Sequence, residues 1–254
     1  MSNEDNNNDI AIRVRNLRKS FGARNVLNGI NLEVARGETL TILGRSGTGK
    51  SVFLKLLIRL QQADEGEIEV NGEAITRLPV DDLNRVRKTV GFLFQQAALY
   101  DSLTVEENVA FPIRRHEQAT DAELKERVGE LLQKVAMEKD RNKMPDEISG
   151  GMKKRVGLAR ALALDPQVIL LDEPTAALDP ITAGEMNELI RELQHERHIS
   201  SVVVTHDMRS VKRVADRVAM LHEGDILIEG TLEDLKQSEN PFVSKFVRES
   251  EEVS

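Results

Sequence analysis

Apolar residues recur with a period of two in the first part of the chain. Two sets have this spacing, which is typical of strands with one buried face: Ile10, Ile12 and Val14, then Ile30, Leu32 and Val34. Residues 39–43 predict a third short strand that leads directly into a glycine-rich turn. A set at helical spacing follows the turn and predicts a helix: Val52, Phe53, Leu56, Leu57 and Leu60. Asn71 and Gly72, between alternating residues, predict a β-hairpin.

The middle of the chain has the pattern of helices instead. Thr120 followed by Glu123 is a capping-box signature, and the apolar stripe behind it consists of Leu124, Val128, Leu131, Leu132 and Val135. We therefore expect a mainly helical insert over about residues 97–164. Apolar runs at residues 168–171 and 201–205 predict buried strands, and residues 219–228 predict a last hairpin. This alternation predicts an α/β fold with a mostly parallel sheet and antiparallel hairpins to one side.

The composition excludes several classes of protein. Of the 254 residues, 40% are apolar and 31% charged, as in globular domains rather than disordered or fibrous chains. The absence of cysteine excludes disulfides and thiol-based metal sites. No apolar run approaches the roughly 18–20 residues that cross a bilayer, and the net charge of −8 argues against binding to nucleic acid. We expect the polar residues 1–9 to be a flexible leader rather than a secretory signal, and the protein to be cytosolic.

Residues 44–51 (GRSGTGKS) form a complete P-loop between a predicted strand and a predicted helix. Its glycines allow successive backbone N–H groups to point at phosphate oxygens, and the positive end of the helix dipole adds to the attraction. We expect Lys50 to reach the β- and γ-phosphates and Ser51 to bind Mg²⁺. The nucleotide-binding residues predicted in this segment are Gly44, Arg45, Ser46, Gly47, Thr48, Gly49, Lys50, Ser51 and Val52.

Two carboxylates follow a later buried strand. Asp172 and Glu173 end the run at residues 168–171, so we expect them at the carboxyl edge of the sheet, where open α/β sheets bind ligands. Asp172 is predicted to hold Mg²⁺, and Glu173 is predicted to be the general base that deprotonates the attacking water. Such a strand end is common by itself and becomes specific in combination with the P-loop. His206 ends a neighbouring strand and is predicted to hydrogen-bond the γ-phosphate or the water.

A second anion site is predicted at residues 148–152 (ISGGM), about a hundred residues after the P-loop. Ser149, Gly150 and Gly151 stand at the start of a helix, where unpaired N–H groups attract anions. Two phosphate sites so far apart in the chain fit best if the second binds a nucleotide on another copy. The basic residues 153–155 are interpreted as a solvated helix face rather than a nucleic-acid site.

With these motifs in the family order, the sequence resembles the ATP-binding subunits of ABC transporters over nearly its whole length. The resemblance implies one ABC ATP-binding domain over residues 10–239, with Glu173, His206 and Lys50 as catalytic residues. It implies that ATP is bound also by Phe21, Val26 and Gln95, and that Mg²⁺ is held by Ser51, Gln95 and Asp172. It further implies that Ser149, Gly150, Gly151 and Asp179 act in trans across a dimer.

The sequence departs from the common family pattern at a few positions. Ile148 and Met152 replace the usual Leu and Gln of the signature, Ala176 replaces a common Ser, and Phe21 replaces the usual Tyr. None of these changes removes a Gly, Lys, Asp, Glu or His that the chemistry needs. The Met152 variant resembles the Mce-associated (Mla-type) lipid-transport ATPases, as do residues 99–112 and 178–182.

The resemblance also implies partners. Two subunits are expected to sandwich two ATP molecules and to drive a separate multi-spanning permease, as peripheral proteins on the cytoplasmic face of the inner membrane. The Mla-type likeness implies phospholipid as cargo, an Mce-domain lipid-binding protein and a small accessory subunit. Another cargo, such as amino acids, metals or drugs, is the alternative, because the ATP-binding subunit does not touch cargo. An ABC regulator without transport function is the alternative of a different class.

Two further apolar sets have no assigned partner in the sequence. The first, Leu99, Tyr100, Leu103 and Phe111, either contacts the permease or packs within the helical insert. The second lies in the C-terminal tail, residues 240–254, where Phe242, Phe246 and Val247 form an apolar face. We expect this face to dock against the second subunit.

Overall fold

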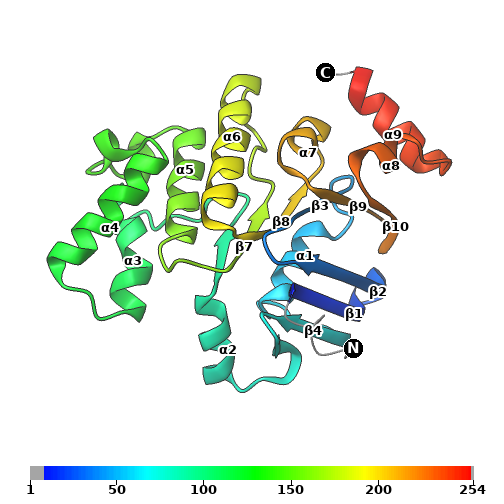
Figure 1. Cartoon of the computed structure of the whole chain (residues 1–254), viewed down its shortest axis with the longest axis horizontal. Helices are drawn as coiled ribbons and strands as arrows, with labels where there is room; N and C mark the ends of the chain where they lie inside the picture. The colour runs from blue at the N-terminus through cyan, green and yellow to red at the C-terminus, as the bar shows by residue number, and fades with distance from the viewer. Residues whose placement is uncertain (1–8, 253–254) are drawn as a thin grey trace.

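The computed structural model describes residues 9–252, and within this range the strands form two sheets (Figure 1). The predicted flexible leader, apart from its last residue, lies outside the described residues. The strands are β1 (Ile10–Phe21), β2 (Arg24–Ala35), β3 (Thr39–Leu43), β4 (Glu65–Val70), β5 (Glu73–Ala74), β6 (Val90–Leu93), β7 (Val168–Asp172), β8 (Ser200–Thr205), β9 (Arg217–His222) and β10 (Asp225–Gly230). The helices are α1 (Lys50–Leu57), α2 (Val80–Lys88), α3 (Val105–His116), α4 (Asp121–Lys134), α5 (Gly150–Ala161), α6 (Pro180–Arg197), α7 (Met208–Val214), α8 (Leu232–Lys236) and α9 (Pro241–Glu252).

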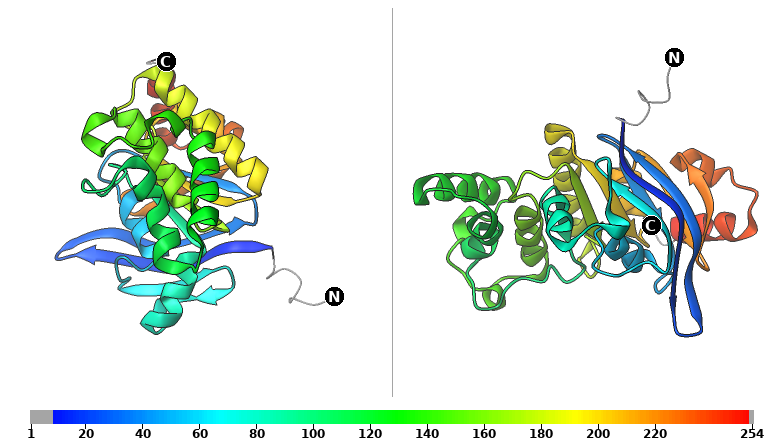
Figure 2. Two further views of the ribbon diagram at one scale, coloured as in Figure 1. Left: turned by 90° about the vertical axis from the view of Figure 1, so that its left-hand side faces the viewer. Right: turned by 90° about the horizontal axis from the view of Figure 1, so that it is seen from below.

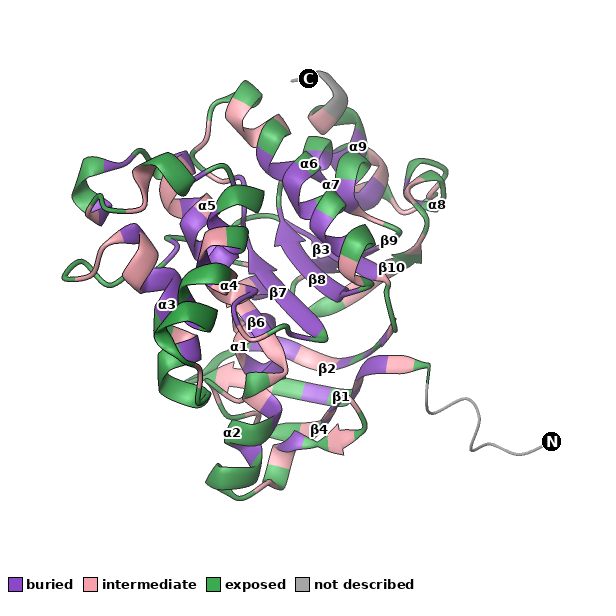
Figure 3. Cartoon of the chain, turned by 60° about the vertical axis from the view of Figure 1, so that its left-hand side comes forward, coloured by how far each residue is buried: buried purple, intermediate pink, exposed green. Residues whose placement is uncertain are grey.

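The larger sheet has the strand order β10-β9-β3-β8-β7-β6. β3, β7 and β8 are buried at every residue, which explains their continuous apolar runs in the sequence. They run parallel to one another and to β6 and β9, whereas β10 returns antiparallel to β9. Figure 3 shows these buried strands beneath the surrounding helices. The predicted α/β fold with a mostly parallel sheet is confirmed.

Alternate residues of the central strands enter different hydrophobic cores. On β7, Val168 and Leu170 pack with α1 and the smaller sheet, whereas Ile169 and Leu171 pack with helices α3 to α6. β8 divides in the same way, with Val202 in the first core and Val203 in the second. Because side chains alternate between the two faces of a strand, one apolar run supplies both cores. Packing on both faces holds the strand in place and thereby positions the residues at its end.

The smaller sheet is antiparallel and has the order β2-β1-β4-β5. Figure 2 shows its first two strands as a long twisted pair at the edge of the molecule. β4 turns into β5 through Asn71 and Gly72, whose φ angles are 51° and 82°. Two positive φ angles are what a two-residue hairpin turn of this kind requires, so the predicted Asn-Gly hairpin is confirmed.

Helices α3, α4 and α5 lie together at one end of the molecule (Figures 1 and 2). α4 begins at the predicted capping box: Thr120 Oγ1 accepts a hydrogen bond from Glu123 N, and Thr120 N donates to Glu123 Oε2 at 2.8 Å. The apolar stripe predicted behind this box is buried. Among residues 9–252, no helix combines the length and the apolar character needed to cross a membrane.

Two expectations about apolar faces are wrong. α1 ends at Leu57, so Leu60 lies beyond the helix and is 49% exposed. The C-terminal face is covered by its own chain: Phe246 and Val247 of α9 are buried among residues of α7, α8 and β9, and Phe242 stacks on the ring of His222. Helical spacing identified this apolar face correctly, but the packing that covers it is a tertiary property.

Candidate functional site

The P-loop leaves the carboxyl end of β3 and enters α1 through two glycines with positive φ. These are Gly47 (φ 78°) and Gly49 (φ 107°), and a Cβ atom at Gly49 would lie only 2.8 Å from Val26 Cγ1. Gly49 is also the N-cap of α1 and has no side chain that could cap the helix. The first-turn N–H groups of α1 are therefore available to an anion, and the helix dipole favours negative charge there.

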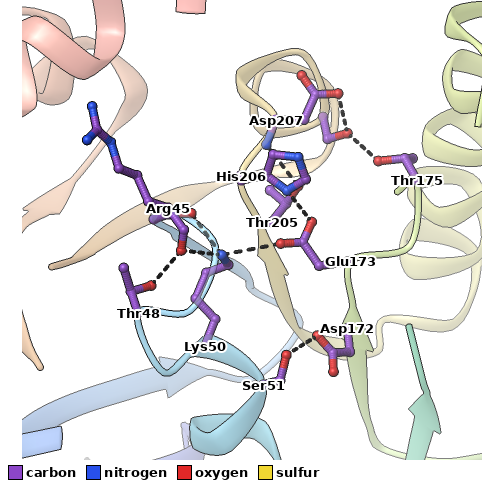
Figure 4. A network of polar contacts seen from close by, with 12 residues as sticks. Arg45, Thr48, Lys50, Ser51, Asp172, Glu173, Thr175, Thr205, His206 and Asp207 are labelled. Carbon is purple, nitrogen blue, oxygen red and sulfur yellow. Dashed lines mark hydrogen bonds and ion pairs between the residues drawn. The ribbon is translucent and has the colours of Figure 1, made fainter. Parts of the chain in front are cut away.

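Lys50 is buried at the base of this loop. Its Nζ donates hydrogen bonds to Gly44 O at 2.8 Å and Arg45 O at 3.1 Å, and it lies 3.3 Å from Glu173 Oε1 (Figure 4). The loop carbonyls aim the ammonium across the sheet edge rather than into solvent. A phosphate group bound at the start of α1 would meet this charge.

Ser51 and Asp172 form the second contact across the sheet edge. Ser51 Oγ donates a 2.7 Å hydrogen bond to Oδ1 of Asp172, which is the last residue of β7 (Figure 4). Burial raises the pKa of the Asp172 carboxyl above its ordinary value, against the opposing effect of the Ser51 hydrogen bond. A buried carboxylate beside a hydroxyl is an oxygen donor set that suits Mg²⁺, which takes few protein ligands together with phosphates and water.

Glu173 lies at the centre of the site. Its Oε2 is 2.9 Å from His206 Nδ1, and its Oε1 faces Lys50 (Figure 4). β7 and β8 are neighbours in parallel register, which places residues 172–173 beside the end of β8 and hence beside His206. Glu173 also has a left-handed backbone, with φ at 47°. This conformation is unfavourable for a non-glycine residue, so the surrounding contacts hold it in place.

Lys50, Ser51 and Glu173 line a pocket of about 330 Å³, whereas His206 lines a second pocket of about 440 Å³ together with Glu173. The lining of the first pocket contains the following residues that the sequence predicted: Phe21, Val26, Ser46, Gly47, Gly49, Lys50, Ser51, Val52, Gln95 and Glu173. Phe21 is 48% exposed, and Lys19 Nζ lies 5.2 Å from the centre of its ring. Arg45 and Thr48 line an adjoining pocket of about 380 Å³ instead. The pocket, the glycine loop and the Ser51–Asp172 pair fit ATP with Mg²⁺.

The predicted second anion site lies elsewhere on the chain. Ser149 caps α5, with its Oγ accepting from Met152 N at 3.2 Å, and no atom lies within 4 Å of a Cβ built on Gly150. Neither residue lines the pocket of Phe21 and Lys50. Asp179 caps α6 through hydrogen bonds that lower the pKa of its carboxyl, chiefly that from the Thr182 hydroxyl. One chain therefore does not bring these residues to its own P-loop.

Two residues of the site were missed in the sequence. Arg24, paired with Phe21 at the end of the β1–β2 hairpin, donates to Gly47 O at 3.0 Å. Lys154, interpreted as part of a solvated face, is only 6% exposed and donates to Glu173 O at 2.6 Å, so that interpretation is wrong for this residue. Burial lowers the pKa of Lys154 to about 8. Its spacing of three from Gly151 and four from Leu158, both buried, was the signal that could have identified it.

Nearly the whole chain is similar to known proteins. A family model described as ABC transporter matches residues 27–176. "Probable ribonucleotide transport ATP-binding protein mkl" of Mycobacterium leprae is 40% identical over 238 residues, or 94% of this chain and 69% of that protein. "Protein TRIGALACTOSYLDIACYLGLYCEROL 3, chloroplastic" of Arabidopsis thaliana is 37% identical over 259 residues, or 95% of this chain and 74% of that protein. The chain spans about two thirds of the length of such curated relatives.

A solved structure has the same fold. The dimeric post-hydrolysis state of the ATP-binding cassette MJ0796, bound to ADP and Pi, superposes with a TM-score of 0.81 at 34% sequence identity. The match covers 87% of this chain and 98% of that one.

Proposed function

The chain belongs to the ABC transporter family, and on this premise we propose which residues hydrolyse ATP and what the hydrolysis drives. As a member it is an ATP-hydrolysing subunit, which binds ATP, dimerises and works with a membrane permease.

The phosphate groups of ATP are held by the backbone of the P-loop and by Lys50. Lys50 Nζ is already aimed at this place by Gly44 O and Arg45 O, and phosphate oxygens offer it stronger, charge-assisted bonds. Ser51 and Asp172 hold Mg²⁺, with Gln95 of the same pocket as a further ligand. Mg²⁺ held by these residues would supply positive charge that offsets the negative charge of the phosphate groups.

Glu173 is the general base, and the single observation that carries this assignment is its contact with both Lys50 and His206. The carboxylate stands beside the atom that would hold the γ-phosphate, so it can accept a proton from water attacking that phosphate. His206 uses Nδ1 for Glu173, which leaves Nε2 to hydrogen-bond the γ-phosphate or the water. His206 thereby orients the base and senses the substrate.

Ser149, Gly150, Gly151 and Asp179 act on the nucleotide of a second copy. In support, the start of α5 is exposed at Ser149 and Gly150 and is not part of its own chain's pocket. The similar cassette MJ0796 is dimeric with ADP and Pi. The γ-phosphate would then bridge two chains and favour the closed dimer, which hydrolysis releases.

Replacing Glu173 by Gln tests the catalytic assignment. The variant should retain ATP binding, lose about 10²–10⁴-fold in turnover as expected for loss of a general base, and accumulate an ATP-bound dimer. Steady-state phosphate release and size-exclusion chromatography with ATP measure both. Undiminished turnover would remove Glu173 from this role.

The permease docks in a groove of about 430 Å³ beside β6. The groove is lined in part by Phe92, Phe94, Tyr100, Phe111, Pro112 and Leu164. Tyr100 and Phe111 lie with ring centroids 4.7 Å apart and are among the exposed large apolar residues, whereas Leu99 packs on the helical core. Gln95 joins the end of β6 to this segment, so a change at the nucleotide pocket has a short route to the groove.

The cargo is phospholipid, moved between membranes with the ATPase on the cytoplasmic face of the inner membrane. The likeness to a protein named after a galactolipid supports lipid, whereas other relatives are named for transport of ribonucleotides, sulfate or thiosulfate, and methionine. An Mce-domain protein and a small accessory subunit are the proposed further partners. Purification of the complex from detergent-solubilised membranes tests this: a permease with an Mce-domain protein supports lipid transport, and a binding protein for a water-soluble solute overturns it.

A further inference from the structure

Lys154 is a buried lysine that joins helix α5 to the proposed base. It lies one helical turn after Gly150, and its Nζ donates a 2.6 Å hydrogen bond to the backbone oxygen of Glu173. The catalytic roles assigned above do not include Lys154. A lysine buried to this extent is unusual unless it is paired or bonded.

The bond acts on a strained backbone. Glu173 has φ at 47°, a conformation that a non-glycine residue keeps only when its surroundings hold it there. Its N–H donates to Val204 O at 2.9 Å, and its carbonyl accepts from Ala176 N at 3.2 Å as well as from Lys154. The neighbouring strand thus holds one side of the Glu173 peptide, and α5 holds the other through Lys154.

The same helix begins at the site proposed for the partner's nucleotide. Ser149 caps α5 and Gly150 opens it, so about one turn, or roughly 5.4 Å of helix axis, separates that site from Lys154. Rigid secondary-structure elements are among the structures that carry energetic coupling between two sites. The first turn of α5 therefore connects the nucleotide bound by a second copy to the general base of this chain's own site.

We propose that Lys154 is a positioning residue that couples the position of the Glu173 backbone to the position of α5. Binding of one nucleotide at the start of α5 thereby positions the general base that acts on the other nucleotide. The proposal rests on the role of Glu173 and of the α5 start given above. Lys154 touches neither phosphate nor water in this scheme, and it acts only through the Glu173 backbone.

Replacing Lys154 by Met tests the proposal, because Met fills the same space without a donor. Loss of a hydrogen bond from a charged group predicts about a 10- to 100-fold lower kcat. The KM for ATP should change little, because Lys154 is not in the nucleotide pocket. Lys154→Gln, which keeps a donor, should recover part of the loss. Lys153→Met, the neighbouring and less buried lysine, is the matched control and should leave kcat within about twofold.

Mixed dimers test the route of action. One chain carries Glu173→Gln, which silences its own base, and Lys154→Met is placed either in that chain or in its partner. The proposal predicts no further loss in the first arrangement and about a 10-fold or greater loss in the second. Equal losses in both arrangements would overturn it, as would full kcat in Lys154→Met or a loss confined to KM. If homodimers with Glu173→Gln in both chains retain full turnover, the assignment of the base fails instead.

Discussion

Lys50 Nζ and Glu173 Oε1 lie 3.3 Å apart, so the P-loop lysine and the proposed base form one buried ion pair. The pair joins the start of α1, which follows β3, to the residue after β7, across the intervening strand β8. Phosphate oxygens that bind Lys50 compete with Glu173 for the same ammonium. Substrate binding is therefore expected to release the carboxylate toward the attacking water at the moment when a base is needed.

Replacing Lys50 by Ala should weaken ATP binding about 10- to 100-fold, because a hydrogen bond to a charged group contributes roughly 1.5–3 kcal/mol. Titration calorimetry with ATP in the presence of Mg²⁺ measures the affinity. Lys55→Ala on the same helix, where the lysine is partly exposed, is the control and should bind within about twofold of the unchanged protein. Similar losses in both variants would mean that general positive charge, rather than the contact, attracts the phosphates.

Complementation in mixed dimers should show that α5 acts in trans. Gly150→Arg places a bulky cation where a Cβ meets no atom within 4 Å, so the chain should fold normally while its second anion site is blocked. Homodimers of Gly150→Arg and of Lys50→Ala are both expected to be inactive. Their mixture forms dimers with one intact composite site and should regain ATPase activity.

The control for this experiment is Gly129→Arg in α4, where a Cβ also meets no atom within 4 Å. It should leave ATPase activity unchanged. A mixture of Gly150→Arg and Lys50→Ala chains that forms dimers and stays inactive would contradict action in trans.

Removing the paired rings of the groove should separate the ATPase from its permease. The double variant Tyr100→Ala with Phe111→Ala removes two exposed aromatic side chains that contact each other. Neither side chain belongs to the buried core. We expect it to keep the ATPase activity of the isolated subunit and to lose co-purification with the membrane complex. Val80→Ala, at an exposed apolar residue on α2, should have no effect on either. Normal recovery of the complex would exclude the groove as the docking site.

The Glu106–Arg141 pair should make stability depend on pH. Arg141 donates to Glu106 at 2.9 and 2.5 Å, and this hydrogen bonding holds the pKa of Glu106 below its ordinary value of 4.5. Because the folded pKa is the lower one, the stabilisation is present above 4.5 and is lost as the pH falls through the folded pKa. Glu106→Gln should therefore cost about 1 kcal/mol of unfolding free energy near neutral pH and less in acid.

Urea unfolding at several pH values measures this difference. The control is Glu196→Gln, whose partner Lys134 is more exposed, so a smaller effect is expected. A cost of Glu106→Gln that does not change with pH would assign it to packing rather than to the ion pair.

Elements with a local cause were predictable from the sequence. The capping box at Thr120, the turn at Asn71 and Gly72 and the P-loop each depend on residues within about one turn of chain. The position of the acids was predictable for a related reason. Strands buried on both faces read as short apolar runs, so the residue that ends each run marks the sheet edge. Asp172, Glu173 and His206 were identified in this way.

Predictions failed where the partner of a side chain comes from a distant part of the chain. The face of Phe246 and Val247 was assigned to a second subunit, yet residues of α7, α8 and β9 cover it. Lys154 was grouped with its solvated neighbours, yet packing of α5 against the end of β7 buries it on Glu173. The sequence determined the helices, strands and the chemical groups at their ends, because these follow from short-range sterics and hydrogen bonding. Only the tertiary structure decided which of those groups meet, because that depends on how whole elements pack over the shared core.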